Sequence, residues 1–280
     1  MSHGSKRRIE NWFFIPPVVC LALLVTVNVS GHDVEIFRWL NEEGRVAGDS
    51  FWISITTFGD GLVLFVLTLL FIRRKPALAW SLVVSWCLIA LWIKGLKAEI
   101  VTFRPPSILS PDQFRLIGAA YRYNSFPSGH ATSIAAFVAS LCLFFRQKVV
   151  RVALIGGALL IAYSRIVIGV HWTTDVLAGL IGGWLSALVG YALSTRLKFG
   201  TSQIAQIIFA IITAGAALRM FFVNHTDYPQ SHRLLQLIAA ASILYAGCDY
   251  LAARFKKRSP ARDPRAAGLP KIAGEPTGNK

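Results

Sequence analysis

Residues 174–194 read TDVLAGLIGGWLSALVGYALS, a stretch of 21 residues in which Asp175 carries the only charge. A helix needs about 17 to 25 mostly apolar residues to cross a bilayer, so this stretch is long enough to span one. Further apolar runs precede and follow it, and they lie at 12–30, 58–72, 77–96, 129–145, 152–170, 203–223 and 233–252. The sequence therefore predicts an all-α, polytopic membrane helix bundle with eight spans.

The composition agrees with a membrane protein. Of the 280 residues, 54% are hydrophobic and 15% are charged, against about 25% charged residues in an average soluble domain. The net charge of +15 could indicate a nucleic-acid partner, but the basic residues lie between long apolar runs and form no solvated face. This pattern excludes a water-soluble enzyme and a nucleic-acid-binding domain. Because no pair of cysteines has CxxC spacing, we expect neither a disulfide framework nor a zinc site.

The distribution of Lys and Arg predicts the orientation, because cytoplasmic loops carry an excess of these residues. Placing the N-terminus inside puts 19 of the 29 Lys and Arg residues on the cytoplasmic side and makes the acidic segment 30–50 an outer loop. The run at 12–30 is longer than the apolar core of a signal peptide, about 7 to 15 residues, so we interpret it as an uncleaved span. We expect a multi-pass protein of a bacterial-type inner (plasma) membrane with both termini in the cytoplasm.

Three groups of polar residues lie at the outer ends of predicted spans. The first group is Lys97 with Arg104, the second is the segment Phe126-Pro127-Ser128-Gly129-His130, and the third is Ser164-Arg165 with His171 and Asp175. With the orientation above, all three groups emerge on the same side of the membrane. A charged residue within an apolar helix costs about 2.5 to 3.5 kcal/mol on insertion scales, so Arg165 is a functional-site candidate.

The residue types in these groups suit a phosphoryl group. Lys97, Arg104 and Arg165 offer fixed positive charge and several N–H donors for phosphoryl oxygens. A helix that begins near Ser128 directs free backbone N–H groups toward the same place, and Gly129 permits a close approach of the backbone. We therefore expect an anion-binding site that needs no metal.

The histidines add the reactive groups. His171 and Asp175 are four residues apart at the start of a predicted span, so the carboxylate can accept a hydrogen bond from one ring nitrogen and fix the tautomer. The other ring nitrogen is then a free nucleophile, and His130 can protonate a departing oxygen. Together these residues predict covalent phosphoryl transfer.

The three groups, in this order and spacing, resemble the three-part signature of the type 2 phosphatidic acid phosphatase family, in its membrane lipid phosphatase branch. The resemblance covers about residues 50–195, a six-span core once the first span is added. It implies that His171 is the nucleophile and forms a phosphohistidine, that Asp175 supports it, and that His130 is the acid for the leaving group. It also implies metal-independent, cofactor-free catalysis, in which the phosphoryl oxygens are held by Lys97, Arg104, Ser128, Gly129 and Arg165.

Some features lie outside this signature or depart from it. After Arg104 the chain has no further basic residue until Arg115, which weakens the case for a polyanionic head group. The loop 106–126 mixes aromatic residues with arginine, as a head-group recognition loop or an ordinary interfacial aromatic belt would. Asp60, at the outer end of the second span, could reach the site and support it, and Glu99 lies between Lys97 and Arg104, but we expect both to be solvated carboxylates at span ends. The remaining histidines read as ordinary surface or headgroup-level residues, and they are His3, His32, His225 and His232.

We expect a six-span phosphatase core at 1–200, two additional transmembrane helices at 201–252 and a basic, disordered cytoplasmic tail at 253–280. Nothing in 203–252 looks catalytic, and these spans could widen the lipid-facing surface or pair protomers into a homo-oligomer. In the sixth span, Gly179 and Gly183 form a GxxxG motif, which indicates close helix packing.

The leading hypothesis is a lipid phosphatase whose site faces the periplasm or exterior. Its substrate would be a membrane lipid phosphate of the undecaprenyl diphosphate, phosphatidylglycerol phosphate, phosphatidic acid or lipid A type, and the sequence does not choose among them. The alternatives are transfer of the phosphoryl group from His171 to a second lipid, and a non-catalytic anion binder or transporter. Transporters usually hold charge near the membrane midplane between repeated halves, whereas here the charge lies at span ends. A vanadate-dependent haloperoxidase would share the motifs, but eight apolar spans argue against that soluble class.

Overall fold

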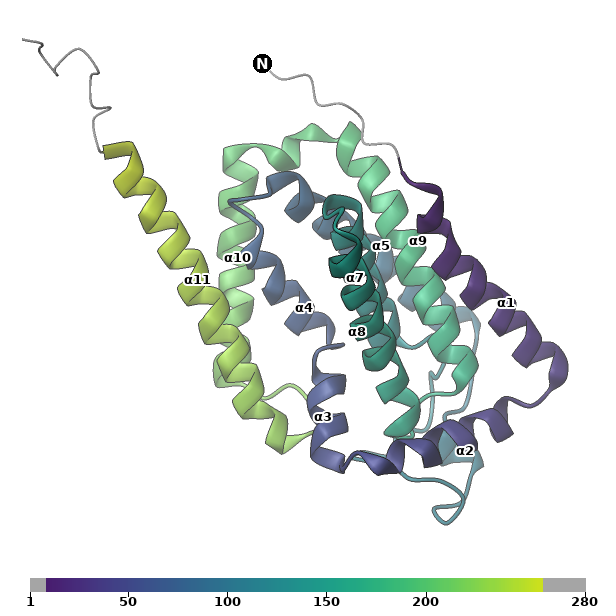
Figure 1. The fold of residues 1–280 in the computed structure, drawn as a ribbon. Coiled ribbons are helices and arrows are strands. Elements are labelled where there is room, and N and C mark those ends of the chain that lie inside the picture. The colour runs from purple at the N-terminus through teal and green to yellow at the C-terminus, as the bar shows by residue number, and fades with distance from the viewer. Residues whose placement is uncertain (1–8, 259–280) are drawn as a thin grey trace, which may run out of the picture.

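The computed structural model describes residues 9–258, and this part of the chain consists of helices and the loops that join them (Figure 1). Between residues 9 and 258 there is no β-strand, only an isolated bridge from Phe103 to Tyr123. The predicted all-α helix bundle is confirmed. The α-helices are α1 (Ile15–Ser30), α2 (Asp33–Glu43), α3 (Asp49–Thr57), α4 (Gly61–Leu67), α5 (Pro76–Glu99), α6 (Pro105–Ile108), α7 (Gly129–Phe144), α8 (Lys148–Val167), α9 (Thr173–Arg196), α10 (Gln203–Phe222) and α11 (His232–Arg258).

Each predicted apolar run corresponds to a helix or part of one. Within residues 9–258, six helices are long and apolar enough to cross a membrane, or seven if α3 and α4 are counted as one bent span. The run at 129–145 forms α7, which has only 16 residues and a length of about 24 Å. This is less than the bilayer core of about 30 Å. Its short length is accommodated because α7 lies inside the bundle, where every residue from Ala131 to Leu143 is buried (Figure 1).

The second predicted span is wrong in shape. The run at 58–72 is the second half of a broken span, in which α3 and the segment Gly61–Leu70 meet at 56°. The break follows from Asp60, whose Oδ1 accepts the backbone N–H groups of Leu62 at 2.9 Å and Val63 at 3.1 Å. A carboxylate in this position caps a new helix start, so α4 begins in a new direction at Gly61.

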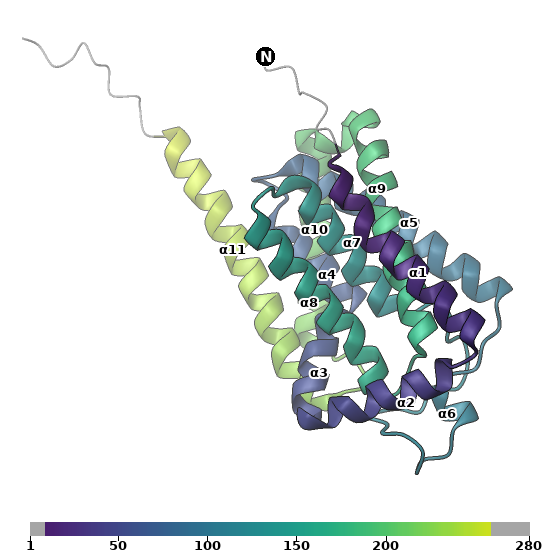
Figure 2. The same cartoon turned by 45° about the vertical axis from the view of Figure 1, so that its right-hand side comes forward.

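Helix α2 lies where an outer loop was expected. It is too polar to be recognised as a span, and it crosses the end of the bundle instead of entering it (Figure 2). Its buried Asn41 donates to the carbonyl oxygens of Ile166 at 3.0 Å and Val167 at 2.8 Å, and its Oδ1 accepts the N–H of Arg115 at 2.7 Å. One side chain therefore connects α2, the last turn of α8 and the loop 106–126.

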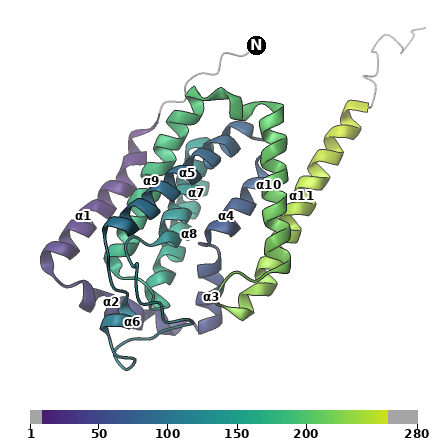
Figure 3. The same cartoon turned by 180° about the vertical axis from the view of Figure 1, so that it is seen from behind.

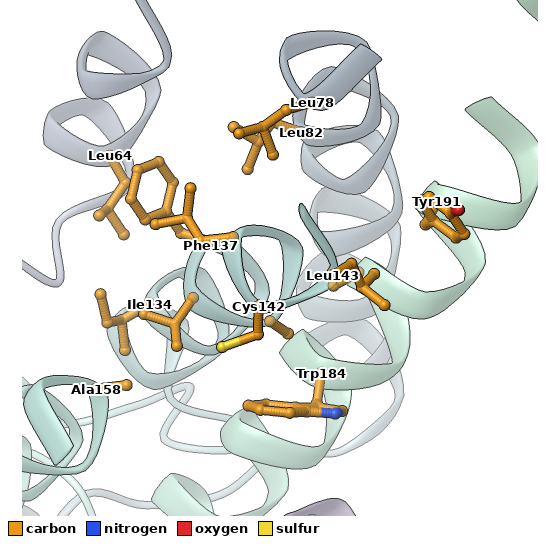
Figure 4. Packing of buried hydrophobic residues seen from close by; sticks show 14 of the residues in the cluster. Leu64, Leu78, Leu82, Ile134, Phe137, Cys142, Leu143, Ala158, Trp184 and Tyr191 are labelled. Carbon is orange, nitrogen blue, oxygen red and sulfur yellow. The ribbon is translucent and has the colours of Figure 1, made fainter. Parts of the chain in front are cut away.

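The core of the bundle surrounds α7. Phe137 and Ile134 of α7 pack with Leu64 of α4, Leu82 of α5 and Trp184 of α9 (Figure 4). On the α9 side the contact is closer still. A Cβ added at Gly183 would lie 2.1 Å from the carbonyl oxygen of Thr132, so only glycine fits there. The interpretation of the GxxxG motif as close helix packing is confirmed.

Helices α10 and α11 form a hairpin that packs on the outside of α4 (Figure 3). Met220 and Leu235 are fully buried in that contact with Val63 and Val66. At the opposite end of the hairpin, Arg74 Nε of the α4–α5 connection lies 2.7 Å from Asp249 Oδ1 of α11. The hairpin is therefore attached to the broken span along its whole length.

The two ends of the chain concern the predicted tail and the predicted orientation. The tail was expected to be disordered from residue 253, but α11 continues to Arg258, so that boundary is wrong. Residues 259–280, with the rest of the predicted tail, lie outside the described residues, as do the basic residues 6–8 used in the orientation argument. The four cysteines are free, with Cys20 and Cys142 buried and Cys87 and Cys248 exposed.

Candidate active site

The first turn of α9 fixes the position of His171. Gly169 reverses the chain after α8 with a φ of +82°, in the left-handed region that favours glycine. A Cβ at this position would also lie 2.5 Å from the carbonyl oxygen of Arg115. The reversal places His171 just before α9, and Asp175 Oδ2 accepts the backbone N–H of Trp172 at 2.9 Å. Asp175 therefore caps α9 and faces His171 at the same time.

His171 and Asp175 form a buried pair. His171 Nδ1 lies 3.2 Å from Asp175 Oδ2, and both side chains are about 2–3% exposed. The same carboxylate oxygen accepts the hydroxyl of Ser125. Burial holds the pKa of His171 well below its usual value, and the positive charges of Arg104, Arg165 and Lys97 lower it further. His171 is therefore neutral at physiological pH, with Nε2 as the ring nitrogen available to a substrate.

Three cations come from three different parts of the chain. Lys97 Nζ at the end of α5 donates to the carbonyl oxygen of Asn124 at 2.9 Å. Arg104 donates through Nε to the carbonyl oxygen of Tyr123 at 3.0 Å and through Nη1 to that of Val170 at 3.2 Å. These bonds go to neutral carbonyl groups, so no carboxylate neutralises either cation through them.

Arg165 is the most deeply buried of the three cations. Its Nη1 donates to Thr56 Oγ1 of α3 at 2.7 Å, and its buried Nε has no hydrogen-bond partner among residues 9–258. A buried guanidinium with a free N–H is able to accept an anionic ligand. The side chain of Arg165 is thus held by the broken span while part of its donor capacity stays open.

The N-terminus of α7 completes the anion-binding groups. Ser128 N–H donates to the carbonyl oxygen of Asp175 at 3.0 Å, which joins the start of α7 to the start of α9. The hydroxyl of Ser128 is fully buried and has no partner within residues 9–258, and it makes no bond to the helix that it precedes. The first-turn N–H groups of α7 and this hydroxyl are therefore donors without an internal acceptor.

A cavity of about 240 Å³ brings most of the predicted residues together. Ser128 and Asp175 are not in its lining and lie behind it, where they support Gly129 and His171. The remaining six predicted residues line the cavity directly, and they are Lys97, Arg104, Gly129, His130, Arg165 and His171.

The cavity also contains residues that the sequence interpretation missed. His225 of the α10–α11 loop, read as an ordinary headgroup-level residue, lines the cavity, and its Nε2 lies 2.9 Å from Asp60 Oδ1. Asp60 is therefore not a solvated carboxylate, since it caps α4 and bonds His225. The only signal available beforehand was that this loop emerges on the same side as the three motifs. The other additional lining residues are Thr56, Thr57, Tyr121, Thr226, Asp227 and Tyr228.

The loop 106–126 contributes one aromatic side chain to the cavity. The ring of Tyr121 lies 5.2 Å from the guanidinium carbon of Arg104, and its hydroxyl donates to Asp227. Phe114 instead packs in the core under α2, while Tyr123 is exposed. Among the aromatic side chains of this loop, Tyr121 is therefore the one that lines the cavity. Among residues 9–258, no group of three or more His, Cys, Asp or Glu side chains is arranged to hold a metal ion.

Comparison with known proteins relates this geometry to a family. The model of the PAP2 superfamily matches residues 78–199. The lipid A 1-phosphatase of Rhizobium etli is 34% identical over 157 residues, which are 50% of this chain and 65% of that protein. The undecaprenyl-diphosphatase of Sulfolobus acidocaldarius is 29% identical over 161 residues, which are 56% of this chain and 77% of that protein. This chain therefore spans about two thirds to three quarters of the lengths of these relatives.

A solved structure has a similar fold. The crystal structure of LpxE from Aquifex aeolicus is 26% identical, with a TM-score of 0.51, and the match covers 56% of this chain and 93% of that one. The segment matched by the family model runs from α5 to α9 and contains every residue of the predicted site, whereas α3, α4 and the α10–α11 hairpin lie outside it. The chain is therefore a membrane protein that is similar to the PAP2 superfamily over residues 78–199.

Proposed function

We propose that the protein is an integral-membrane phosphatase that hydrolyses a terminal phosphate of a lipid, without metal or cofactor, through a phosphohistidine. The observation that carries this proposal is the His171–Asp175 pair, which opens on a cavity with three cations and a second histidine, His130. The match of residues 78–199 to the PAP2 superfamily model supports the same chemistry. The relatives are named as phosphatases of lipid A and of undecaprenyl diphosphate, so a lipid phosphate is the substrate class.

The phosphoryl group would bind between the cations and the start of α7. Lys97, Arg104 and Arg165 would hold its oxygens from one side, because all three line the cavity and Arg165 Nε is a free donor among residues 9–258. The buried hydroxyl of Ser128 and the backbone N–H of Gly129 would donate from the other side, where the helix dipole also favours an anion. This arrangement supplies positive charge and hydrogen bonds around all the oxygens of a phosphoryl group in transfer.

In the first step, Nε2 of His171 attacks phosphorus, and the bond from phosphorus to the ester oxygen breaks. His130 gives its proton to that oxygen, so the lipid leaves as an alcohol and the phosphoryl group stays on His171. Asp175 stabilises the positive charge that forms on the imidazole, because its Oδ2 faces Nδ1 at 3.2 Å.

In the second step, a water molecule attacks the phosphohistidine. His130 now accepts a proton from the water, the bond between nitrogen and phosphorus breaks, and inorganic phosphate is released. The same residue thus acts as acid and then as base, as microscopic reversibility requires.

We further propose that the cavity faces the periplasm or exterior and that both termini are cytoplasmic. The excess of Lys and Arg in the segments that the sequence assigns to the cytoplasmic side supports this orientation. A cysteine introduced at the exposed Gln113 should then react with an impermeant thiol reagent added outside, and one at the exposed Gln147 should not. The reverse pattern would show that the topology is inverted.

We also propose that residues 1–200 form the six-span core and that residues 201–252 form an added helix pair.

The function is tested with protein purified in detergent and incubated with one lipid phosphate at a time, in EDTA. We expect release of inorganic phosphate from at least one lipid, and no release by the matched His171→Ala protein. Loss of activity in EDTA that magnesium restores would contradict metal independence. If phosphate is released only when a second lipid is present as acceptor, or is transferred to that lipid, the protein is a phosphotransferase. Tight phosphate binding without turnover of any lipid would instead indicate an anion binder.

A further inference from the structure

The loop 223–231 between α10 and α11 forms a wall of the cavity, although it lies outside the segment matched by the family model. It is attached at three points. His225 Nε2 lies 2.9 Å from Asp60 Oδ1, the hydroxyl of Tyr228 donates to the carbonyl oxygen of Ile117 at 3.3 Å, and the carboxylate of Asp227 accepts the hydroxyl of Tyr121. These points belong to the broken span and to the loop that follows Arg104. The hairpin thus adds its own side chains to a site built by the family segment.

Two carboxylates, Asp60 and Asp227, line the cavity together with the three cations, and they differ in the number of their hydrogen-bond partners. Asp60 is largely compensated, because it accepts the backbone N–H groups of Leu62 and Val63 and faces His225. Within residues 9–258, the neutral hydroxyl of Tyr121 is the hydrogen-bond partner of Asp227, and Asp227 is exposed. The carboxylate of Asp227 therefore adds a negative charge to the cavity wall that no cation pairs with among these residues.

Tyr121 places this negative charge next to the phosphate-binding groups. Its ring lies 5.2 Å from the guanidinium carbon of Arg104, and its hydroxyl reaches Asp227, so a single aromatic ring separates the two charges. Burial and the hydrogen bond to Asp227 together raise the pKa of Tyr121 to about 12, so the hydroxyl stays protonated and keeps donating. Asp227 also lines the same cavity as His130, which the proposed mechanism places next to the leaving group.

We propose that Asp227 makes this cavity selective for a lipid monophosphate whose leaving group is uncharged and carries hydroxyl groups, such as a glycerol or a sugar, against a lipid diphosphate. This inference rests on the proposed function, since it concerns which lipid phosphate the same site accepts.

The charges in the cavity support a single phosphate. A phosphate monoester carries a charge of about −1.5 to −2 at neutral pH, which the three cations Lys97, Arg104 and Arg165 balance once the negative charge of Asp227 is counted with them. A diphosphate adds a second anionic group on the leaving side, where the carboxylate of Asp227 would repel it. A hydroxyl on the leaving group can instead donate to the free lone pairs of the same carboxylate.

The variant Asp227→Asn separates charge from structure. The amide oxygen of asparagine can still accept the hydroxyl of Tyr121, so the wall keeps its hydrogen bond while the negative charge is removed. The matched control is Asp112→Asn, which removes an exposed carboxylate on the same loop as Tyr121 that does not line the cavity. Both variants should unfold at the temperature of the wild-type protein.

The experiment measures kcat/KM for phosphate release from phosphatidic acid and from a prenyl diphosphate in matched detergent micelles. The wild-type protein should prefer the monophosphate, and Asp227→Asn should reduce the ratio of the two kcat/KM values by about fivefold to tenfold, mainly through a lower KM for the diphosphate. Asp112→Asn should leave the ratio unchanged. A wild-type preference for the diphosphate, or an unchanged ratio in Asp227→Asn, would overturn the proposal.

A binding measurement distinguishes this proposal from the proposed function. Titration calorimetry with methylphosphonate and methylenediphosphonate reports the same selectivity without turnover. We expect the wild-type protein to bind the monophosphonate more tightly, and Asp227→Asn to gain affinity for the diphosphonate alone. If no lipid is hydrolysed but this selectivity is present, the phosphatase function fails and the role of Asp227 stands. If lipids are hydrolysed but the two ligands bind equally in both proteins, the role of Asp227 fails alone.

Discussion

Asp175 Oδ2 lies 3.2 Å from His171 Nδ1 and also accepts hydrogen bonds from the N–H of Trp172 and the hydroxyl of Ser125. One carboxylate oxygen therefore caps α9, holds the loop that precedes α7 and fixes the imidazole. The same atom, Asp175 Oδ2, caps α9 and contacts the imidazole of His171. The orientation of the proposed nucleophile therefore depends on the correct formation of the first turn of α9.

The first prediction concerns this carboxylate. Asp175→Asn can keep the hydrogen bonds from Trp172 and Ser125 through its amide oxygen, but it can no longer stabilise a positive imidazole. We expect the unfolding temperature to change little and kcat for lipid phosphate to fall by about 10²- to 10⁴-fold. Steady-state kinetics and thermal unfolding in the same detergent check this. A fall in kcat of less than tenfold would mean that Asp175 is structural only.

The second prediction separates the roles of the two histidines. A general acid contributes about 10²- to 10⁴-fold when the leaving group needs a proton, and this contribution shrinks when the leaving group is a good one. His130→Ala should therefore lose much less activity on p-nitrophenyl phosphate than on a lipid phosphate, while His171→Ala should be inactive on both. Equal losses for His130→Ala on the two substrates would contradict its role as the acid.

The third prediction concerns pH. Because burial and the nearby cations lower the pKa of His171, its neutral, nucleophilic form persists as the pH falls below the ordinary histidine value of about 6.5. With p-nitrophenyl phosphate at saturation, the rate of phosphoenzyme formation should stay level between pH 7 and 6 and decline only at lower pH. Rapid-quench measurements check this, with His130→Ala as the control that removes the second histidine. A midpoint at or above 6.5 in that variant would show that His171 is not shielded as the structure implies.

The fourth prediction tests how the site depends on helix packing. Gly183→Ala would place a Cβ 2.1 Å from the carbonyl oxygen of Thr132, so α7 and α9 must move apart. Overpacking of this kind costs about 1 to 3 kcal/mol, and it should also reduce kcat, because Ser128 and Asp175 lie at the ends of the same two helices. The matched control is Gly156→Ala on α8, where nothing lies within 4 Å. Equal unfolding temperatures of the two variants would contradict the packing argument.

Much of this arrangement could be predicted from the sequence, for a physical reason. Spans are set by the length of apolar runs, and an ionisable residue such as Arg165 in such a run costs enough free energy to indicate function. The His171–Asp175 contact follows from their spacing across one helical turn. Lys97, Arg104 and His130 could be assigned to one side of the membrane because successive spans cross it in alternating directions.

What the sequence could not predict are contacts between distant segments. The break at Asp60 depends on a side chain that caps α4, yet the same residue type also occurs in ordinary loops. His225 reaches Asp60 across a sequence separation of 165 residues, and no spacing rule connects them. Helix α2 was missed because its polar face gives no membrane signal, although its Asn41 organises the end of α8.

The central claim is that the phosphoryl group passes through a covalent bond to His171. The most direct measurement is rapid acid-free quenching of the enzyme with ³²P-labelled substrate, followed by peptide mapping by mass spectrometry. The account predicts an acid-labile, alkali-stable phosphohistidine at His171, reduced to background in His171→Ala and accumulating in the presence of good leaving groups. Label on another residue, or full hydrolytic turnover by His171→Ala, would contradict it.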